Sequence, residues 1–299
     1  MTFDLNRHAL VILNPISGAG KGKALLPMIN RSLEEHGFEA ELLETGGRGD
    51  AEIAAREKRD DLEVIVAIGG DGTISEAIAG LEGRHVPVCI VPVGTANCLA
   101  NELHQTAKPE EVHRRLEAMQ TEVMDCFAFN GRHGFLMAGA GLDGEVARRV
   151  ALARKGTLRQ LAYYLPSLAT LVRYPFYPFS LTVDGEKITD EATFVEVANA
   201  REYGGPLILV AHADRSDGLL DILVVEKASR RHIAGYMARA FFCKRVWGRG
   251  VKFLRGKHIV LEANEKVPYQ VDGDFIGYLP LEIKVVPGAV SIVINPQDE

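Results

Sequence analysis

Residues 63–73 read EVIVAIGGDGT, and this stretch decides the fold. Its apolar middle, residues 64–68, predicts a strand that is buried on both faces, as the strands of parallel sheets are. Gly69, Gly70 and Gly72 predict a tight turn, and residues 74–79 are expected to follow as a helix. A buried strand that turns directly into a helix is the repeating unit of an α/β fold with a parallel sheet.

The same alternation continues on both sides of this stretch. Strand signals lie at 9–13, 39–43 and 86–91, and helix signals lie at 24–36, 50–59 and 109–119. Residues 1–125 are therefore predicted to form an α/β domain whose parallel sheet is covered by helices.

After Val123 strand signals follow one another, with turn residues between them. They lie at 124–129, 134–138, 179–183, 193–198, 207–211, 219–225, 258–263, 268–271, 281–286 and 290–294. Successive strands of this kind predict an antiparallel β-sandwich over residues 126–299, whose last strand is a candidate to return to the first domain. Two helical inserts are expected, at about 144–173 and 229–242.

The turn at Gly69–Thr73 has the chemistry of a phosphate site. Glycines let the backbone approach an anion, and the free N–H groups at a helix start favour negative charge. Asp71 does not suit direct contact with phosphate, because both are anionic. It suits a role in holding Mg²⁺ or in orienting water or another side chain.

Two more loops leave equivalent strand ends, at Asn14–Gly18 and Pro92–Asn97, and Ser17, Gly94, Thr95 and Asn97 lie in them. The carboxyl ends of strands in an open α/β sheet form the ligand crevice, so these loops and Thr45 are nucleotide-site candidates. Taken singly, Asn14 and Thr45 also suit ordinary turns. Residues 18–23 (GAGKGK) do not form a P-loop, because Pro15 and Gly22 stand where that motif needs Gly and Ser or Thr.

The composition sets limits on function. The chain has 299 residues, 47% of them apolar, and a net charge of −6, which argues against a general nucleic-acid binder. Its four cysteines lack CxxC or metal-site spacing, and two of them, Cys89 and Cys126, lie in or beside apolar runs as core residues do. This pattern favours a reducing compartment. No apolar run reaches about 18 residues, so a cytoplasmic protein is expected.

Positive charge is concentrated in one block. Residues 227–261 hold ten of the 34 Lys and Arg residues and no Asp or Glu. Such a block in an otherwise acidic chain fits contact with an anionic membrane surface, and it also fits a solvated helical face; the sequence leaves both open.

An ordered set of motifs resembles the bacterial diacylglycerol kinase type of lipid kinase, which is related to sphingosine and ceramide kinases. The matching segments are 14–18 (NPISG), 69–73 (GGDGT), 92–97 (PVGTAN), Asp125, 139–144 (GAGLDG), 217–221 (DGLLD) and 272–274 (DGD). The resemblance implies an NAD-kinase-like nucleotide domain followed by a sandwich that receives the lipid. It implies ATP as the phosphate donor, a lipid alcohol as the acceptor and Mg²⁺ as a cofactor.

The resemblance also implies roles for individual residues. It places nucleotide contacts at Gly70, Asp71, Gly72, Thr73 and Thr95, with Thr45 a weaker match. It places a structural Mg²⁺ at the side chain of Asp217 and the backbone carbonyls of Asp214 and Leu219. Asp274 is the candidate proton acceptor, with Asp71 and Asp125 as further catalytic carboxylates.

Two positions depart from the family pattern. Asp274 stands where members usually carry Glu, and Cys98 stands where many bacterial members carry Asp. These departures keep open a regulatory protein that has lost catalysis, and the GGDGT motif keeps open an NAD kinase. The lipid is not identified by the sequence, and a homodimer stays open. A lipid substrate predicts peripheral association with the inner membrane surface.

Overall fold

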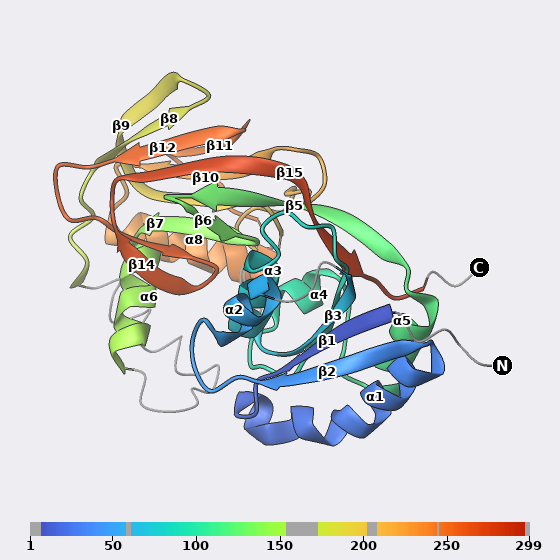
Figure 1. Cartoon of the computed structure of the whole chain (residues 1–299). Coiled ribbons are helices and arrows are strands. Elements are labelled where there is room, and N and C mark those ends of the chain that lie inside the picture. Colours follow the sequence, from blue (N-terminus) through green and yellow to red (C-terminus); the bar gives the residue numbers. More distant parts are fainter. Residues whose placement is uncertain (1–6, 58–60, 154–172, 202–207, 244, 297–299) are drawn as a thin grey trace. The chain divides into compact units, whose positions relative to one another are not determined.

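The computed structural model describes residues 7–57, 61–153, 173–201, 208–243 and 245–296. The chain forms two compact units. Unit 1 comprises Met1–Met124 and Gly288–Glu299, and unit 2 comprises Asp125–Pro287. The chain passes between them on two strands, β5 (Thr121–Phe129) and β15 (Leu281–Val293). Figure 1 labels the elements along the chain.

Unit 1 is built on a parallel sheet. Its strands are β1 (Arg7–Leu13), β2 (Phe38–Glu44), β3 (Leu62–Gly69), β4 (Val88–Pro92) and the end of β15, in the order β2-β1-β3-β4-β15. The middle residues of β1, β3 and β4 are buried. Continuous burial explains their unbroken apolar runs, since helices cover both faces of such a sheet.

Six helical segments complete the described part of unit 1. They are the 3₁₀ segment η1 (Ser17–Leu25), α1 (Leu26–Glu35), α2 (Asp50–Glu57), α3 (Asp71–Ala79), α4 (Cys98–Glu102) and α5 (Pro109–Ala118). Leu33 of α1 and Val112 of α5 share one hydrophobic cluster with Val11 of β1. Helices α2 and α3 pack closely, because a Cβ at Gly80 would lie only 2.2 Å from the Glu52 carbonyl oxygen.

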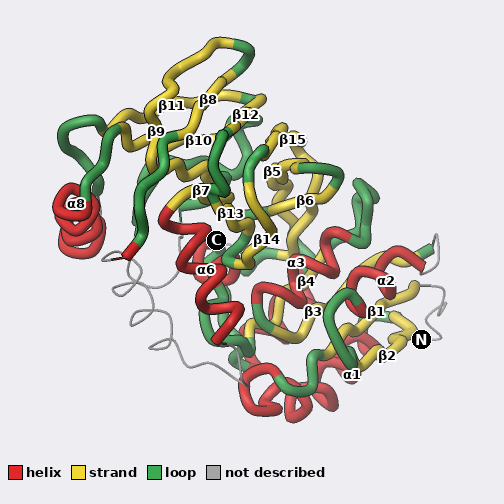
Figure 2. The backbone as a smooth tube through the Cα atoms, turned by 90° about the vertical axis from the view of Figure 1, so that its left-hand side faces the viewer, coloured by secondary structure: helices red, strands yellow, loops and turns green. Residues whose placement is uncertain are grey.

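Unit 2 is dominated by antiparallel strands, drawn in yellow in Figure 2. Besides parts of β5 and β15, they are β6 (Arg132–Gly134), β7 (Met137–Gly141), β8 (Phe179–Val183), β9 (Glu186–Ala198), β10 (Leu220–Glu226), β11 (Val251–Gly256), β12 (His258–Glu262), β13 (Pro268–Val271) and β14 (Asp274–Tyr278). Helices α6 (Leu142–Ala153) and α8 (Arg230–Cys243) are the described inserts. The predicted fold class, an α/β domain followed by a β-sandwich with helical inserts, is confirmed.

Some local predictions were wrong. The described part of the strand expected at 207–211 is a loop, whose Leu209 and Val210 are buried against α8 and β10. The strands expected at 281–286 and 290–294 are one strand, β15. The first insert is helical from Leu142 to Ala153, and residues 154–172 of that prediction lie outside the described residues.

Candidate functional site

Hydrogen bonds join the loops that leave β1, β3 and β4 at one edge of the unit 1 sheet. The Asn14 side-chain amide donates to the Thr73 hydroxyl over 3.1 Å. The backbone N–H of Asn14 donates to the Ile68 carbonyl, and that of Val93 donates to the Gly69 carbonyl, both over 2.9 Å. The structure therefore brings together the three loops that strand order alone placed at this edge.

Glycines at this edge allow backbones to cross closely. A Cβ at Gly94 would lie 2.4 Å from the Cα of Gly70, and one at Gly18 would lie 2.1 Å from the Val93 carbonyl oxygen. Gly18 also has a φ of +57°, which side chains rarely adopt. Gly72, in contrast, is exposed and would meet nothing within 4 Å, so the start of α3 presents open backbone at this edge.

The other nucleotide-site candidates of unit 1 lie on the same loops. Ser17 opens η1, and its N–H donates to the Asn14 carbonyl over 3.2 Å. Thr95 is exposed, while the Asn97 side chain donates to the Gly94 carbonyl over 3.0 Å. Thr45 is buried after β2, where its N–H donates to the Leu13 carbonyl over 2.9 Å.

The carboxyl group of Asp71 points to the start of α4. It accepts hydrogen bonds from the backbone N–H groups of Asn97, Cys98 and Leu99. Burial raises the pKa of Asp71, and these hydrogen bonds oppose the rise because they favour the charged form. Its Oδ1 atom is buried without a hydrogen-bond partner among the described residues. Sequence reasoning missed this capping role, because Asn97 at the helix start is itself a preferred capping residue, yet its side chain makes no cap hydrogen bond.

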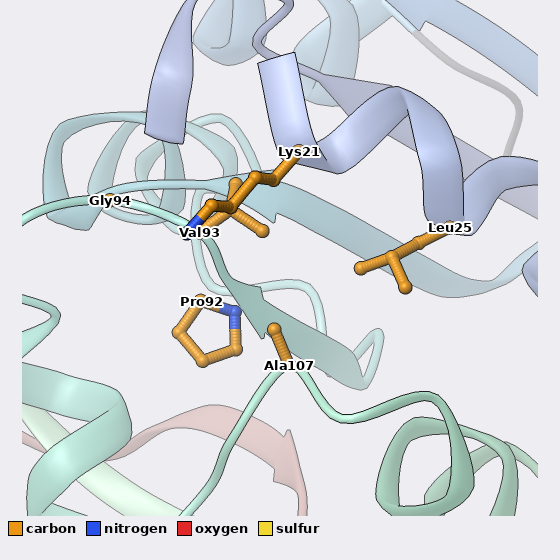
Figure 3. Close-up of a pocket in the computed structure, with 6 residues that line it drawn as sticks. All are labelled: Lys21, Leu25, Pro92, Val93, Gly94 and Ala107. Carbon is orange, nitrogen blue, oxygen red and sulfur yellow. The ribbon is translucent and has the colours of Figure 1, made fainter. Parts of the chain in front are cut away.

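A cavity of about 350 Å³ adjoins these loops in unit 1. It is lined by Lys21, Leu25, Pro92, Val93, Gly94 and Ala107. In Figure 3 the Lys21 side chain extends over Val93, while Leu25 and Ala107 face the same space. Lys23, two residues along, forms an ion pair with Glu44 at 3.0 Å instead. The cavity thus combines apolar walls with one cation.

The Asp214–Leu219 turn of unit 2 is held by its own side chains. Asp214 Oδ1 accepts from the backbone N–H and the hydroxyl of Ser216, and these bonds lower the pKa of Asp214. Asp217 Oδ1 accepts from the Leu219 N–H over 3.0 Å. Asp125, which is buried in unit 2, accepts from the Gly218 N–H over 2.7 Å. The structure therefore places Asp125 beside the predicted metal turn.

Arg255 of β11 provides the positive charge at this turn. Its guanidinium pairs with Asp217 and lies 3.4 Å from Asp221. The described residues contain no group of three His, Cys, Asp or Glu side chains that could hold a metal ion. Backbone carbonyls are further Mg²⁺ ligands, and a cation at Asp217 would compete with the Arg255 guanidinium for its carboxylate. A Mg²⁺ site at this turn therefore stays a prediction.

The 272–274 turn is anchored through Asp272. The Asp272 carboxylate accepts backbone hydrogen bonds from Phe135, Leu136 and Met137 over 2.9, 2.8 and 3.1 Å. Asp274, the candidate proton acceptor, opens β14 and is partly buried. The anchored turn fixes the backbone that carries Asp274.

A second carboxyl pair in unit 2 was missed by sequence reasoning. Glu196 of β9 is only 1% exposed, and neither of its carboxyl oxygens has a hydrogen-bond partner among the described residues. A Cβ at Gly139 would lie 2.6 Å from Glu196 Oε2 and 2.1 Å from Asp143 Oδ2, so the two carboxyl groups flank one point. Burial, and then the negative charge of Asp143, raises the pKa of Glu196 well above its ordinary value. Its signal was a charged residue within an apolar strand.

Two family models match the chain. Residues 8–129 match the diacylglycerol kinase catalytic domain, and residues 137–294 match the YegS C-terminal NAD kinase beta sandwich-like domain. Together these matches extend over nearly the whole described chain, and they confirm the resemblance inferred from the motifs.

Named relatives point the same way. The chain is 32% identical to a diacylglycerol kinase of Mycobacterium tuberculosis (strain ATCC 25618 / H37Rv), with 97% of both chains covered. It is 27% identical to a diacylglycerol kinase of Bacillus subtilis (strain 168), with 92% of both covered. A crystal structure from Bacillus anthracis str. Sterne superposes with a TM-score of 0.80 at 26% identity, covering 97% of this chain and 96% of the other. These comparisons do not favour an NAD kinase or a regulatory protein.

Proposed function

The chain belongs to the diacylglycerol kinase family, and from this premise we propose that it transfers the γ-phosphoryl group of ATP to a hydroxyl group of a lipid. The observation that carries the proposal is the edge of the unit 1 sheet, where three glycine-bearing loops are joined by the Asn14–Thr73 and Val93–Gly69 hydrogen bonds. Open backbone at a helix start beside such loops is suited to phosphate.

The donor is MgATP, bound as substrate by unit 1. Gly70, Gly72 and Thr73 at the start of α3 face its phosphates, with Asn14 holding the Thr73 hydroxyl in place. The Lys21 ammonium adds attraction for the phosphates, and the apolar walls of its cavity receive an uncharged part of the nucleotide.

Three acidic residues are assigned separate roles in the transfer. Phosphoryl transfer depends on positioning and on a carboxylate near the attacking hydroxyl. Asp274 takes the proton of the lipid hydroxyl as that oxygen attacks the γ-phosphorus. Asp71 orders the 94–99 loop and offers its charge to the Mg²⁺ of the bound ATP, whereas Asp125 orders the turn at Gly218 as a positioning residue.

The acceptor is a lipid alcohol, and the names of the relatives make diacylglycerol the first compound to test. Among the described residues no helix is long and apolar enough to cross a bilayer. We propose that the enzyme reaches its lipid by peripheral contact with the inner membrane surface.

The test is an assay with labelled ATP and a panel of detergent-dispersed lipid alcohols, with NAD as a separate acceptor and the product identified by mass. We expect a phosphorylated lipid, no phosphorylated NAD, and a loss of about a hundredfold or more in Asp274→Asn. Asp274→Glu restores the family's usual side chain and should retain turnover. Phosphorylated NAD, or no transfer to any lipid, would overturn the proposal.

A further inference from the structure

Three aromatic side chains at the end of α8 and in the loop after it are exposed. Phe242 is 79% exposed, Trp247 is 47% exposed and Phe241 is 44% exposed. The Phe241 and Phe242 rings meet edge to face with centroids 5.0 Å apart. Trp247 follows this pair by five residues in the chain. Several large apolar side chains exposed within one short segment indicate an interaction site more often than single scattered ones do. These three residues are called the aromatic ridge below.

The ridge is held in place by packing beneath it. Helix α8 buries Ile233, Tyr236 and Ala240 in a hydrophobic cluster with β9 and β10, which turns its end outward. After the helix, Val246 returns to the same cluster and is buried. Buried Ala240 and buried Val246 therefore anchor the chain before and after Phe241 and Phe242. Trp247 directly follows the second anchor and stays partly exposed.

Arg239 and Tyr236 fix the loop to the helix. The Arg239 guanidinium lies 5.2 Å from the centre of the Trp247 ring and donates to the Trp247 carbonyl over 2.7 Å. The Tyr236 hydroxyl donates to the Arg249 carbonyl over 2.6 Å. Gly248 passes so close that a Cβ there would lie 2.6 Å from the Tyr236 ring. These contacts show a built loop with its aromatic side chain directed outward.

Among its described residues, the basic block holds both paired and unpaired cations, and two of the unpaired ones are neighbours of Trp247 in the chain. Within the basic block, Lys227 pairs with Glu191, Lys252 pairs with Glu226, and Arg255 pairs with Asp217. The structure gives no ion pair with a described residue to four exposed arginines, which are Arg230, Arg231, Arg245 and Arg249. Two of them, Arg245 and Arg249, flank Trp247 in the same loop.

We propose that the aromatic ridge inserts into the headgroup region of an anionic bilayer. Arg245 and Arg249 beside the ridge, and Arg230 and Arg231 at the other end of α8, bind lipid phosphates. Tryptophan and phenylalanine favour the membrane interface, and cations near the surface are attracted to anionic lipids. The rest of the chain is acidic and would be repelled there. This inference rests on the proposed function, because a lipid substrate requires a docking surface.

Trp247 supplies the measurement, since it is the only tryptophan of the chain. On vesicles of phosphatidylglycerol and phosphatidylcholine we expect its emission to shift to shorter wavelength and to be quenched by brominated acyl chains. Vesicles of phosphatidylcholine alone should bind weakly, and binding to anionic vesicles should fall as salt rises, because charge is screened within about 8–10 Å at physiological ionic strength.

Variants separate insertion from charge. Phe242→Ala should weaken vesicle binding by about tenfold, the effect of withdrawing part of one aromatic side chain from an apolar phase. Leu42→Ala is the control. The exposed fraction of Leu42 equals that of Phe241, but Leu42 lies on β2 of unit 1, away from the ridge in the chain. The combined variant Arg230→Glu, Arg231→Glu, Arg245→Glu and Arg249→Glu should lose its binding to anionic vesicles.

The assay on detergent-dispersed lipid keeps this inference distinct from the proposed function. All these variants should keep their turnover there, because the ridge contacts no residue assigned to catalysis. An unshifted Trp247 emission spectrum on anionic vesicles, with turnover intact, would contradict membrane insertion of the ridge without contradicting the proposed kinase activity. If Trp247 becomes buried without vesicles, in a dimer that forms as the protein concentration rises, the ridge binds a second copy of the chain and the membrane proposal is wrong.

Discussion

The carboxyl group of Asp71 has a structural role that can be tested separately from its negative charge. It caps the start of α4 through three backbone N–H groups, while one oxygen is left without a hydrogen-bond partner among the described residues. Asp71→Asn keeps an acceptor for the cap, so its melting temperature should stay close to that of the wild type. Its turnover should fall by about a hundredfold, because the amide lacks the charge that serves phosphoryl transfer.

Asp71→Ala removes the cap as well, so it should lose both turnover and about 1 kcal/mol of stability. Thermal melting and single-turnover assays on the two variants give the answer. Near-normal turnover in Asp71→Asn would reduce Asp71 to a helix cap.

Lys21 and Lys23 form a natural pair of test and control. Lys21 borders the unit 1 cavity, whereas Lys23 is held by Glu44. Lys21→Ala should raise the KM for ATP several-fold with little change in kcat, because a charge contact made equally to bound ATP and to the transition state affects binding alone. Lys23→Ala should leave both constants close to the wild-type values. Equal effects in the two variants would remove the cavity from the nucleotide site.

The raised pKa of Glu196 predicts that replacing this residue with Gln stabilises the fold by an amount that depends on pH. The folded state holds its proton more tightly than the unfolded chain does, since the folded pKa is raised. Its contribution is therefore favourable below the ordinary Glu pKa of about 4.3 and is lost as the pH rises toward the folded pKa. Glu196→Gln removes this titration. It should be more stable than the wild type at neutral pH by about 1 kcal/mol or more, roughly 2–4 °C in melting temperature.

The diagnostic feature is that this gain should shrink as the pH falls toward 4. The exposed Glu265 of the same unit provides the control, and Glu265→Gln should show no such trend. A gain in Glu196→Gln that is constant between pH 4 and 8 would contradict a raised Glu196 pKa.

At the scale of elements, the turn before β10 and the strand β11 meet in one ion pair. Because Arg255 holds Asp217, added Mg²⁺ must compete with a guanidinium. Arg255→Ala should therefore show a larger rise in melting temperature on adding Mg²⁺ than the wild type does, by mass action on a freed carboxylate. Asp217→Ala should abolish the response in both backgrounds. A wild type that responds as strongly as Arg255→Ala would show that Mg²⁺ binds without displacing the arginine.

Element prediction succeeded where burial follows a simple period. Strands β8 and β13 have the predicted bounds, because each is a short apolar or alternating run between turn residues. Strand β14 was missed, since Asp274 and Gly277 interrupt its pattern and its residues are only partly buried. Strand β11 was missed because Lys252 and Arg255, on either side of Phe253 and Leu254, read as part of a basic block.

The candidate site was predictable to the extent that it follows strand ends. Asn14, Gly69, Thr73 and Gly94 were placed together from the order of strands and turns, and their loops do meet. The cap made by Asp71, the Asp143–Glu196 pair and the Arg255–Asp217 ion pair depend on contacts between distant segments. No local pattern encodes such contacts, so the sequence alone could not supply them.

At the scale of the whole molecule, unit 1 is completed by residues from beyond unit 2. Ile292 of β15 pairs with Val88 of β4, and the buried Arg115 donates to Asn295 over 3.0 Å. A chain that ends at Pro287 should therefore unfold at a clearly lower temperature than one that ends at Asn295. Calorimetry on the two truncations checks this, and equal melting temperatures would contradict a structural role for the returning strand.

That returning strand also fixes an order of events during synthesis. Residues 1–124 leave the ribosome first, yet the segment that pairs with β4 follows only after all of unit 2 has been translated. Nascent domains generally fold as units from the N-terminal side. Here the first unit must wait with the edge of β4 uncovered while the inserted unit folds. An unpaired strand edge is a template for aggregation, so a nascent chain of this protein should rely on chaperones most just before its last strand emerges.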